Sequence, residues 1–402
     1  MKYLPFIAVH DNKDHMFLNF VFTVNIKRYV FLCSLLIISV FRVHGQNLEA
    51  LSLPHWISDN MILPAGISWC IEGKCEQFSE VSVRFDSVSI SAKADINGEW
   101  KMNFPVVDPG VEGDLVFTHG DQQKIIRNVV SGYTWLCAGQ SNMHFPVNAS
   151  DESNEMKKAI PMVDIRYFNG EKWLRINSEN VGNISAVGAW FSIEMARNQG
   201  SPIGIFVAAR GGTGIEAWLS GNAFPSNETG RRYRVLIDDP EVLQAAEEDK
   251  KDMKPYGQHR LAKWGLGRAV PASLFNKLIQ PFGDLPVCGV LWYQGESNTE
   301  NPAQAKEYRY WLENLISSYR VHFKNTLLPF VIIQLPSYDP GTSEQRKAWR
   351  MLQKVQTEVA GYTPYSEVVD IKDLGELDNI HPRKKMGVGI RAARAASIII
   401  AE

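Results

Sequence analysis

YTWLCAGQSNM, residues 133–143, is the stretch around which this chain is organised. Its apolar run Trp135–Ala138 predicts a buried strand. Gly139 ends that run, and Ser141 then falls at the tip of a turn, exposed and close to unpaired backbone N–H groups. A nucleophilic serine needs such a position, but the N-cap of a helix offers the same one, and these residues alone leave both interpretations open. Met143 excludes the Gly-x-Ser-x-Gly elbow, because it stands where the second glycine would be.

Length and composition set broad limits on the protein. A chain of 402 residues has room for one large domain and one small one. Its 45% of hydrophobic and 21% of charged residues are ordinary for a globular protein with a substantial core. The net charge of −2 gives no reason to expect nucleic acid or an anionic membrane as a partner. The 11 tryptophans are compatible with stacking on sugars and equally with a core.

Residues 1–46 have the features of a leader rather than of a fold. Lys27 and Arg28 precede an apolar run, residues 29–41, that is short for a transmembrane helix. Small residues follow at Val43-His44-Gly45, so the segment predicts a secretory signal peptide with its cleavage site. We therefore expect a secreted or periplasmic protein with no membrane attachment after cleavage. The alternative is an uncleaved membrane anchor.

Four of the five cysteines lie beyond the leader. Cys70 and Cys75 flank a turn-like spacer, which allows a local disulfide in an oxidising compartment. Cys137 and Cys288 lie in apolar runs and are expected to be buried thiols. The histidine and cysteine spacings match no zinc pattern, and we expect neither a metal nor a cofactor.

Residues 47–130 predict a small β-sandwich domain. Val81, Val83 and Phe85 alternate with polar residues, which is typical of a half-buried strand. Asn97-Gly98 indicates a hairpin turn before the next strand. Because no amphipathic helix interrupts these short strands, two packed antiparallel sheets are the economical interpretation.

Residues 131–402 alternate between strand and helix patterns, which predicts a parallel sheet with helices on both faces. The expected strands are 134–138, 164–168, 203–208, 287–293, 328–335 and 367–371. The expected helices are 186–198, 271–278, 303–323, 348–359 and about 385–399. Residues 238–254 are a charged helical insertion that we interpret as a solvated face. Ligands of such sheets bind beyond the carboxyl ends of the strands, so the residues there are the candidates for a site.

Four polar features fall at these ends or in the loop before the last helix. They are Gly139–Met143, Arg210–Thr213, Trp292–Asn298 and Asp378–Pro382. Each alone is compatible with an ordinary turn, polar loop or helix cap. Together they supply the parts of a Ser-His-Asp hydrolase: Ser141 as nucleophile, His381 as base and Asp378 as the carboxylate that orients it. The backbone N–H groups of Ser141 and of Gly211 or Gly212, with the Gln294 side-chain amide, would hold the oxyanion.

These pieces resemble the SGNH hydrolase superfamily, specifically the sialate O-acetylesterase and related carbohydrate acetylesterase family. The resemblance spans nearly the whole chain after the leader, in family order, and its motifs are Ser58–Met61, Asn97–Trp100, Trp135–Met143, Gly211–Trp218, Leu274–Asn276, Gly289–Asn298 and Ile380–Pro382. It implies a flavodoxin-like, three-layer α/β/α esterase domain and acetyl esters of sugars as substrates. The superfamily's third block usually carries an oxyanion asparagine. Here Gln294 is the expected substitute, with Asn298 as a second candidate.

The sequence thus favours a secreted serine esterase that removes O-acetyl groups from carbohydrates, with an acetylated carbohydrate as its partner and no nucleic acid. An acetylxylan-type esterase acting on plant or algal polysaccharide is the alternative of the same class. A catalytically inactive carbohydrate-binding protein is the alternative of another class, and the intact Ser141, Asp378 and His381 argue against it. The sequence carries no signal for an oligomeric state.

Overall fold

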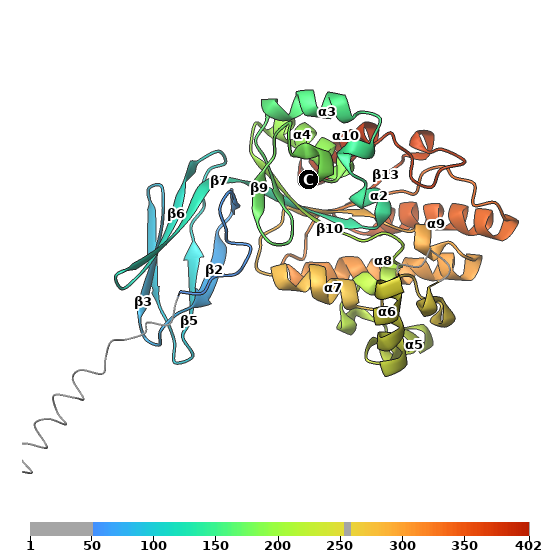
Figure 1. Ribbon diagram of the computed structural model, residues 1–402, viewed down its shortest axis with the longest axis horizontal. Coiled ribbons are helices and arrows are strands. Elements are labelled where there is room, and N and C mark those ends of the chain that lie inside the picture. Colours follow the sequence, from blue (N-terminus) through green and yellow to red (C-terminus); the bar gives the residue numbers. More distant parts are fainter. Residues whose placement is uncertain (1–50, 253–258, 402) are drawn as a thin grey trace, which may run out of the picture. The chain divides into compact units, whose positions relative to one another are not determined.

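The computed structural model describes residues 51–252 and 259–401 (Figure 1). The expected leader, residues 1–46, lies outside the described residues. Seven strands build the main sheet: β7 (Gln122–Gly139), β8 (Ile165–Phe168), β9 (Trp173–Arg175), β10 (Ile203–Ala209), β11 (Gly289–Tyr293), β12 (Phe330–Ile333) and β13 (Ser366–Val369). Six of these contain or overlap the six strands expected from the sequence. The short edge strand β9 was not expected.

The main sheet is parallel except at one edge. Its strand order is β13-β12-β11-β7-β10-β8-β9, and only β9 runs antiparallel to its neighbour. Strand β7 is the first of these strands in the chain and lies in the middle, where β10 and β11 pair with its two sides. The chain therefore builds the sheet outward from β7 in both directions. Such a switch point opens a crevice at the carboxyl ends of the central strands.

Nine helices occur among the described residues. They are α2 (Ser141–His144), α3 (Ser153–Ala159), α4 (Ala186–Gln199), α5 (Glu228–Ile237), α6 (Pro240–Asp252), α7 (Ser273–Leu278), α8 (Pro302–His322), α9 (Ser343–Tyr362) and α10 (Met386–Ala401). Local sequence fixes several of their starts. The side chains of Ser185, Asn301 and Thr342 accept hydrogen bonds from the first turns of α4, α8 and α9. Helices α2, α3 and α5 were not among the expected helices, whereas α6 confirms the helical insertion.

Alternate side chains of the central strands belong to different cores. Leu136 and Ala138 of β7 belong to the cluster that contains α7, α8 and α9, whereas Trp135 and Cys137 belong to the cluster that contains α4 and α10. Successive residues of a strand point to opposite faces, so the sheet is covered on both sides. Figure 1 shows α4 and α10 on one side of it and α7 and α8 on the other. This is the expected α/β architecture.

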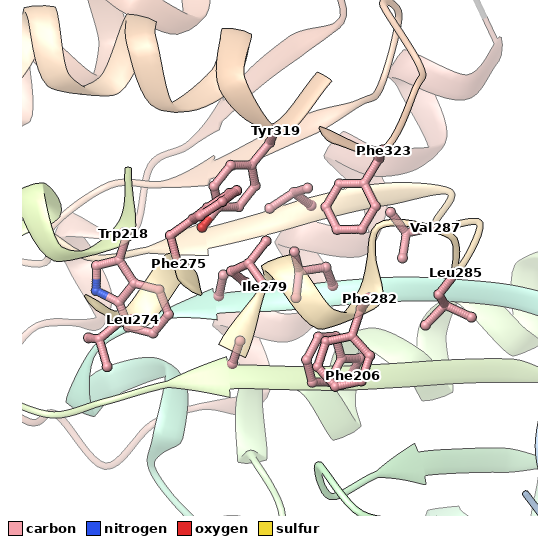
Figure 2. Packing of buried hydrophobic residues seen from close by; sticks show 14 of the residues in the cluster. Phe206, Trp218, Leu274, Phe275, Ile279, Phe282, Leu285, Val287, Tyr319 and Phe323 are labelled. Carbon is pink, nitrogen blue, oxygen red and sulfur yellow. The ribbon is translucent and has the colours of Figure 1, made fainter. Parts of the chain in front are cut away.

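Aromatic packing holds α7 between the sheet and α8. Figure 2 shows Phe275 of α7 beside Tyr319 of α8, and Phe282 beside Phe206 of β10. The ring centroids are 5.8 Å apart in the first pair and 4.3 Å apart in the second. Pairs at these distances add to the burial of the rings themselves. The packing fixes α7 and the turn after it, residues 273–282, between β10 and α8.

Before the main sheet come six further strands: β1 (Ile62–Pro64), β2 (Trp69–Lys74), β3 (Glu80–Phe85), β4 (Val88–Lys93), β5 (Glu99–Phe104) and β6 (Glu112–His119). Strands β3, β4 and β6 pair antiparallel, and β6 continues this pairing onto the first part of β7. Strands β2 and β5 form a separate antiparallel pair. All the strands expected in this region are therefore present, in two sheets.

Two local expectations in this region were wrong. Asn97-Gly98 does form a turn, but β4 and β5 on either side of it pair with β3 and β2 and not with each other. Cys70 and Cys75 are both free thiols, the first exposed and the second buried. Cys70 is the second residue of β2 and Cys75 follows its last residue, so the extended strand holds their Cα atoms roughly 16 Å apart, whereas a disulfide spans at most about 7 Å.

Strand β7 runs through the boundary at residue 130 that the sequence suggested. Its 18 residues pair with β1 and β6 near the start and with β10 and β11 near the end. Contacts between Cα atoms group Leu51–Glu402 into one compact unit. The division into a small β-sandwich domain and an esterase domain stays a prediction.

Candidate active site

All four polar features, the histidine loop among them, meet at the carboxyl ends of the central strands. A cavity of about 370 Å³ opens there. Its lining residues are Gln140, Ser141, Gly211, Gly212, Arg268, Glu296, Ser297, Ile380 and His381. They come from the turns after β7, β10 and β11, from the segment before α7 and from the loop before α10. The crevice expected at the switch point is therefore present, and the predicted nucleophile and base both line it.

Gly139 fixes the turn that presents Ser141. Its φ of 144° is a conformation that side chains disfavour, and a Cβ atom there would lie 2.1 Å from the carbonyl oxygen of Tyr293 on β11. The next residue, Gln140, donates its backbone N–H to the same oxygen at 3.0 Å. The end of β7 is thus held tightly against β11, and the chain turns into the short helix α2. Ser141 is the first residue of α2 and not its N-cap, so the N-cap interpretation was wrong.

Ser141 and His381 face each other across the cavity. The distance from Ser141 Oγ to His381 Nε2 is 2.8 Å, although the two residues are 240 positions apart in sequence. Burial lowers the pKa of His381 below its ordinary value, and the positive charge of Lys385 lowers it further. A neutral imidazole beside a hydroxyl can accept its proton. The arrangement is that of a nucleophile and its general base.

Asp378 lies on the same loop as His381, but its side chain is exposed. Within the described residues, no hydrogen bond joins Asp378 to His381. The loop is shaped instead by Glu376 and Asn379: Asn379 Nδ2 donates to Glu376 Oε2 at 2.9 Å, and Asn379 Oδ1 accepts the backbone N–H of His381 at 3.0 Å. Glu376 Oε1 also accepts the backbone N–H of Arg383 at 2.8 Å. The role of Asp378 stays a prediction.

Backbone donors lie beside the nucleophile. A Cβ atom on Gly211 would lie 3.4 Å from Ser141 Cβ, so the turn after β10 approaches Ser141 closely. Gly212 has a φ of 74°, and its carbonyl oxygen accepts the backbone N–H of Arg268 at 2.9 Å. Among the described residues, the backbone N–H groups of Ser141, Gly211 and Gly212 make no internal hydrogen bond. Such groups are suited to hold an oxyanion.

Gln294 is fully buried behind the cavity rather than on its wall. Its amide nitrogen donates to Gln140 Oε1 and the carbonyl oxygen of Thr213, each at 3.1 Å, and to Asn298 Oδ1 at 2.8 Å. Asn298, the second candidate, is also engaged: its Oδ1 accepts the backbone N–H of Ile215, and its Nδ2 donates to Glu216 Oε2 at 3.1 Å. Both oxyanion assignments stay predictions. In this structure the two amides bind the turns around the nucleophile to one another.

Several residues of the site carried no assignment from the sequence. Glu296 and Asn142 lie inside the quoted motifs, and Lys385 begins the stretch expected to be the last helix. Burial raises the pKa of Glu296 to about 6 and lowers that of Lys385 to about 7. Burial also raises the pKa of Glu216. The sequence did offer one signal for Glu296, a charged residue between a motif glycine and a motif serine. Its burial and its hydrogen-bond partners, however, depend on the fold.

Residues 51–252 and 259–401 contain no group of three or more His, Cys, Asp and Glu side chains with the geometry to hold a metal ion. No helix in these ranges has the length and apolar character required to cross a membrane.

The fold is that of an α/β protein, and the serine and histidine that share a hydrogen bond at the carboxyl ends of its strands have the geometry of the nucleophile–base pair of a serine hydrolase. A family model described as "Carbohydrate esterase, sialic acid-specific acetylesterase" matches residues 131–248 and 256–397. The chain therefore belongs to this family of carboxylic ester hydrolases. The matched residues include the four polar features at the edge of the sheet.

Individual relatives agree with the family. The chain is 27% identical over 307 residues to the sialate O-acetylesterase of Rattus norvegicus, covering 66% of this chain and 56% of the relative. The Homo sapiens protein of the same name is 27% identical over 304 residues, covering 66% and 53%. The chain thus spans a little more than half the length of these curated relatives. The crystal structure of a carbohydrate acetylesterase from Xanthomonas citri has a TM-score of 0.74 and 26% identity, covering 88% of this chain and 76% of that one.

Proposed function

We propose that this protein is a serine esterase that removes O-acetyl groups from carbohydrates, in the manner of a sialate O-acetylesterase. The observation that carries the proposal is the 2.8 Å hydrogen bond between Ser141 Oγ and His381 Nε2 at the wall of a cavity. Membership of the carbohydrate esterase family supports the acetyl ester as the bond that is cleaved. The names of the relatives support a sugar as its alcohol part.

The reaction follows from these groups. His381 Nε2 takes the proton of Ser141 as Oγ attacks the acetyl carbonyl carbon, and a tetrahedral oxyanion forms. The backbone N–H groups of Ser141 and of Gly211 or Gly212 hold the oxyanion, and we retain the Gln294 amide as a proposed donor. When the intermediate collapses, the imidazolium returns the proton to the sugar oxygen, which leaves as an alcohol. Water then attacks the acetyl-serine with the help of His381, and acetate is released.

We assign Asp378 as the carboxylate that orients the His381 ring. Its place three residues before the histidine supports this assignment. In the structure described here the carboxylate is exposed, so the role requires the side chain to turn toward Nδ1 when substrate fills the cavity. Hydrogen bonds between catalytic groups often tighten only in the substrate complex.

The lining of the cavity does not by itself select the sugar, because Arg268 and Glu296, residues of opposite sign, both line it. The names of the curated relatives support a sialic acid as the sugar. Acetylxylan-type polysaccharide is the alternative substrate. A catalytically inactive binding protein is supported less, because binding alone does not require a hydrogen-bonded serine and histidine.

The remaining parts of the proposal concern the protein around the site. The order β10-β7-β11-β12-β13 corresponds to the flavodoxin-like order 2-1-3-4-5, with β8 and β9 added at one edge, which supports an SGNH-type esterase domain at residues 131–402. The two antiparallel sheets that precede this domain in the chain, β2 with β5 and β3 with β4 and β6, support a small β-sandwich domain at residues 47–130. Residues 1–46 support export by a signal peptide, and thus a secreted or periplasmic enzyme.

Ser141→Ala tests the proposed function. The wild-type protein should release acetate from acetylated sialic acids, and more slowly from acetylated xylan. The alanine variant should lose about three orders of magnitude in turnover or more, with an unchanged melting temperature, because no other group can take the acetyl. Acetate release from a panel of both substrates, with 4-nitrophenyl acetate as a small reference ester, makes the measurement. A variant that keeps more than about a tenth of the wild-type activity contradicts the assignment.

A further inference from the structure

Asn142, the residue directly after the nucleophile, joins three separate segments of the chain. It is fully buried. Its Nδ2 donates to Glu296 Oε1 at 2.6 Å and to the carbonyl oxygen of Ile380 at 3.0 Å. Its Oδ1 accepts from Lys385 Nζ at 2.7 Å. Asn142 thus ties helix α2 to the turn after β11 and to the backbone directly before His381.

The two ionisable partners of Asn142 are withdrawn from water. Lys385 is 0% exposed and Glu296 is 7% exposed. The Lys385 ammonium lies over the ring of Phe145, 4.7 Å from its centroid, and 5.7 Å from that of Tyr293. Groups that can carry charge are costly to bury and are rarely justified by stability alone. Their retention beside the nucleophile points to a role in the site.

Lys385 and Glu296 together determine which way the Asn142 amide faces. An amide has an acceptor at one end and two donors at the other. A protonated Lys385 can only donate, so it requires the amide oxygen. A Glu296 carboxylate can only accept, so it requires the amide nitrogen. The reversed amide would lose both hydrogen bonds, and the second N–H of the correct one then points to the Ile380 oxygen.

We infer that Asn142 is a positioning residue: oriented by Lys385 and Glu296, it clamps the loop of His381 onto the nucleophile helix, so that Nε2 stays within hydrogen-bond distance of Ser141 Oγ. The inference rests on the proposed esterase function. It assigns no contact with the substrate to Asn142. Displacing a catalytic group by about 1 Å can cost roughly a hundredfold in rate, so a clamp of this kind affects turnover more than binding.

The same groups set the charge around the base. The charged or titratable side chains around His381 come from its own loop, from the turns after β11 and before α7, and from the residues directly before α3. They are Glu376, Asp378, Arg383, Lys384 and Lys385, Glu296, Arg268, and Asp151 and Glu152, which contact Arg383 and the backbone of Lys385. Burial lowers the pKa of His381, and the Lys385 charge lowers it further. Burial raises the pKa of Glu296 to about 6, and the Lys385 charge offsets only part of this rise. With the lysine present, His381 is neutral, and thus able to act as a base, down to a more acidic pH. The acid limb of the wild-type activity should therefore have its midpoint below about 6.5, the ordinary value.

Two variants test the clamp with the full-length protein and 4-nitrophenyl acetate. Asn142→Ala should lower kcat by about a hundredfold with little change in KM. Lys385→Met keeps the length of the side chain but removes the donor and the charge. It should lower kcat and move the acid limb of activity to higher pH. Lys384→Met, the loss of the neighbouring exposed lysine, is the matched control and should retain the wild-type kcat and pH profile.

The outcomes separate this inference from the proposed function. Folded Asn142→Ala protein with a kcat within about twofold of wild type overturns the inference alone, since a purely structural residue lowers only the melting temperature. If Asn142→Ala does not fold, Lys385→Met decides: an unchanged kcat and an unchanged acid limb overturn the inference. A wild-type protein that hydrolyses no acetyl ester overturns both the proposed function and the clamp.

Discussion

At the scale of single residues, Gln294 has two possible roles: it donates a hydrogen bond to the oxyanion, or it only braces the turns around the nucleophile. As an oxyanion donor, it acts mainly in the transition state, so Gln294→Ala should lower kcat about a hundredfold or more and leave KM nearly unchanged. Kinetics and melting temperature on the same sample make the measurement. Gln334→Ala is the matched control, because Gln334 is also a buried amide but binds only helix α9 through its side chain, at Gln353 and Thr357.

The Gln334→Ala control should be destabilised, because loss of the amide leaves the Gln353 and Thr357 acceptors without their donor. Its kcat should be almost normal. Gln294→Ala removes donors from Gln140, Thr213 and Asn298 and should be destabilised as well. A loss of stability without a loss of kcat would make Gln294 a residue that only braces the turns. A change in KM alone would make it a substrate-binding residue, and Asn298 would be examined next as the donor.

Asp378 offers a second residue-scale test. Asp378→Asn should lower kcat by up to about 10⁴-fold, because an amide can hold the imidazole in the wrong tautomer. Its melting temperature should hardly change, since the side chain is exposed. Asp373→Asn is the control: Asp373 is also exposed and pairs with Arg391 instead of the base, so that variant should remain active. Normal turnover of Asp378→Asn would exclude it as the partner of His381 and direct attention to Glu376.

The sequence predicted that Ser141, after a strand, and His381, in the loop before the last helix, lie close together. Both line one cavity, and their catalytic roles stay predictions. The partners of Gln294, Asn142 and Lys385 were not predictable in this way. An amide or an ammonium selects its partners by burial and orientation, and Lys385 binds Asn142 across 243 positions of sequence. No local pattern encodes such a contact.

At the scale of elements, the tight passage of β7 past β11 is the feature most sensitive to substitution. Gly139→Ala would place a Cβ atom 2.1 Å from the Tyr293 carbonyl oxygen at a φ of 144°. Backbone strain and overpacking together should cost about 2–6 kcal/mol of the free energy of unfolding. Any folded protein should have reduced kcat, because the turn that carries Ser141 must shift. Urea denaturation and ester hydrolysis measure the two effects.

Gly170→Ala is the matched control for this substitution. Gly170 has a φ of 96°, but no atom lies within 4 Å of its would-be Cβ atom. The control therefore carries the backbone strain without the clash and should cost about 1–3 kcal/mol with normal turnover. Equal losses in both variants would show that the contact with β11 is unimportant for the site.

The elements themselves were largely predictable. The six parallel strands and five helices of the α/β region have strong patterns, because they are buried on one or two faces. The strand β9 and the helices α2, α3 and α5 were missed: three residues at an edge carry little signal, and short polar helices resemble loops. Which strands pair with each other was harder to predict than where the strands lie. The Asn97-Gly98 turn is present, but the sequence could not tell that its two strands join different sheets.

At the scale of the whole molecule, the family and the class of fold followed from a few motifs in order, whereas the connection between the two halves did not. A change from β-rich to alternating texture near residue 130 suggested a boundary. The structure has a single strand of 18 residues there. The sequence pattern does change near residue 130, from strands alone to strands that alternate with helices. It cannot show that one strand continues through this point, because the strands on both sides require apolar, β-branched residues there.

That long strand has a consequence for synthesis on the ribosome. Strand β7 ends at Gly139, but its two partners in the main sheet are β10, which ends at Ala209, and β11, which ends at Tyr293. At translation rates of about 5–20 residues per second, β11 follows β7 by roughly 8–30 s. Both edges of the apolar end of β7 are unpaired until β10 emerges, and one edge stays unpaired until β11 emerges. An unpaired edge is the kind of surface that adheres to other chains, so the nascent chain has to keep this strand end from associating until its partners are made.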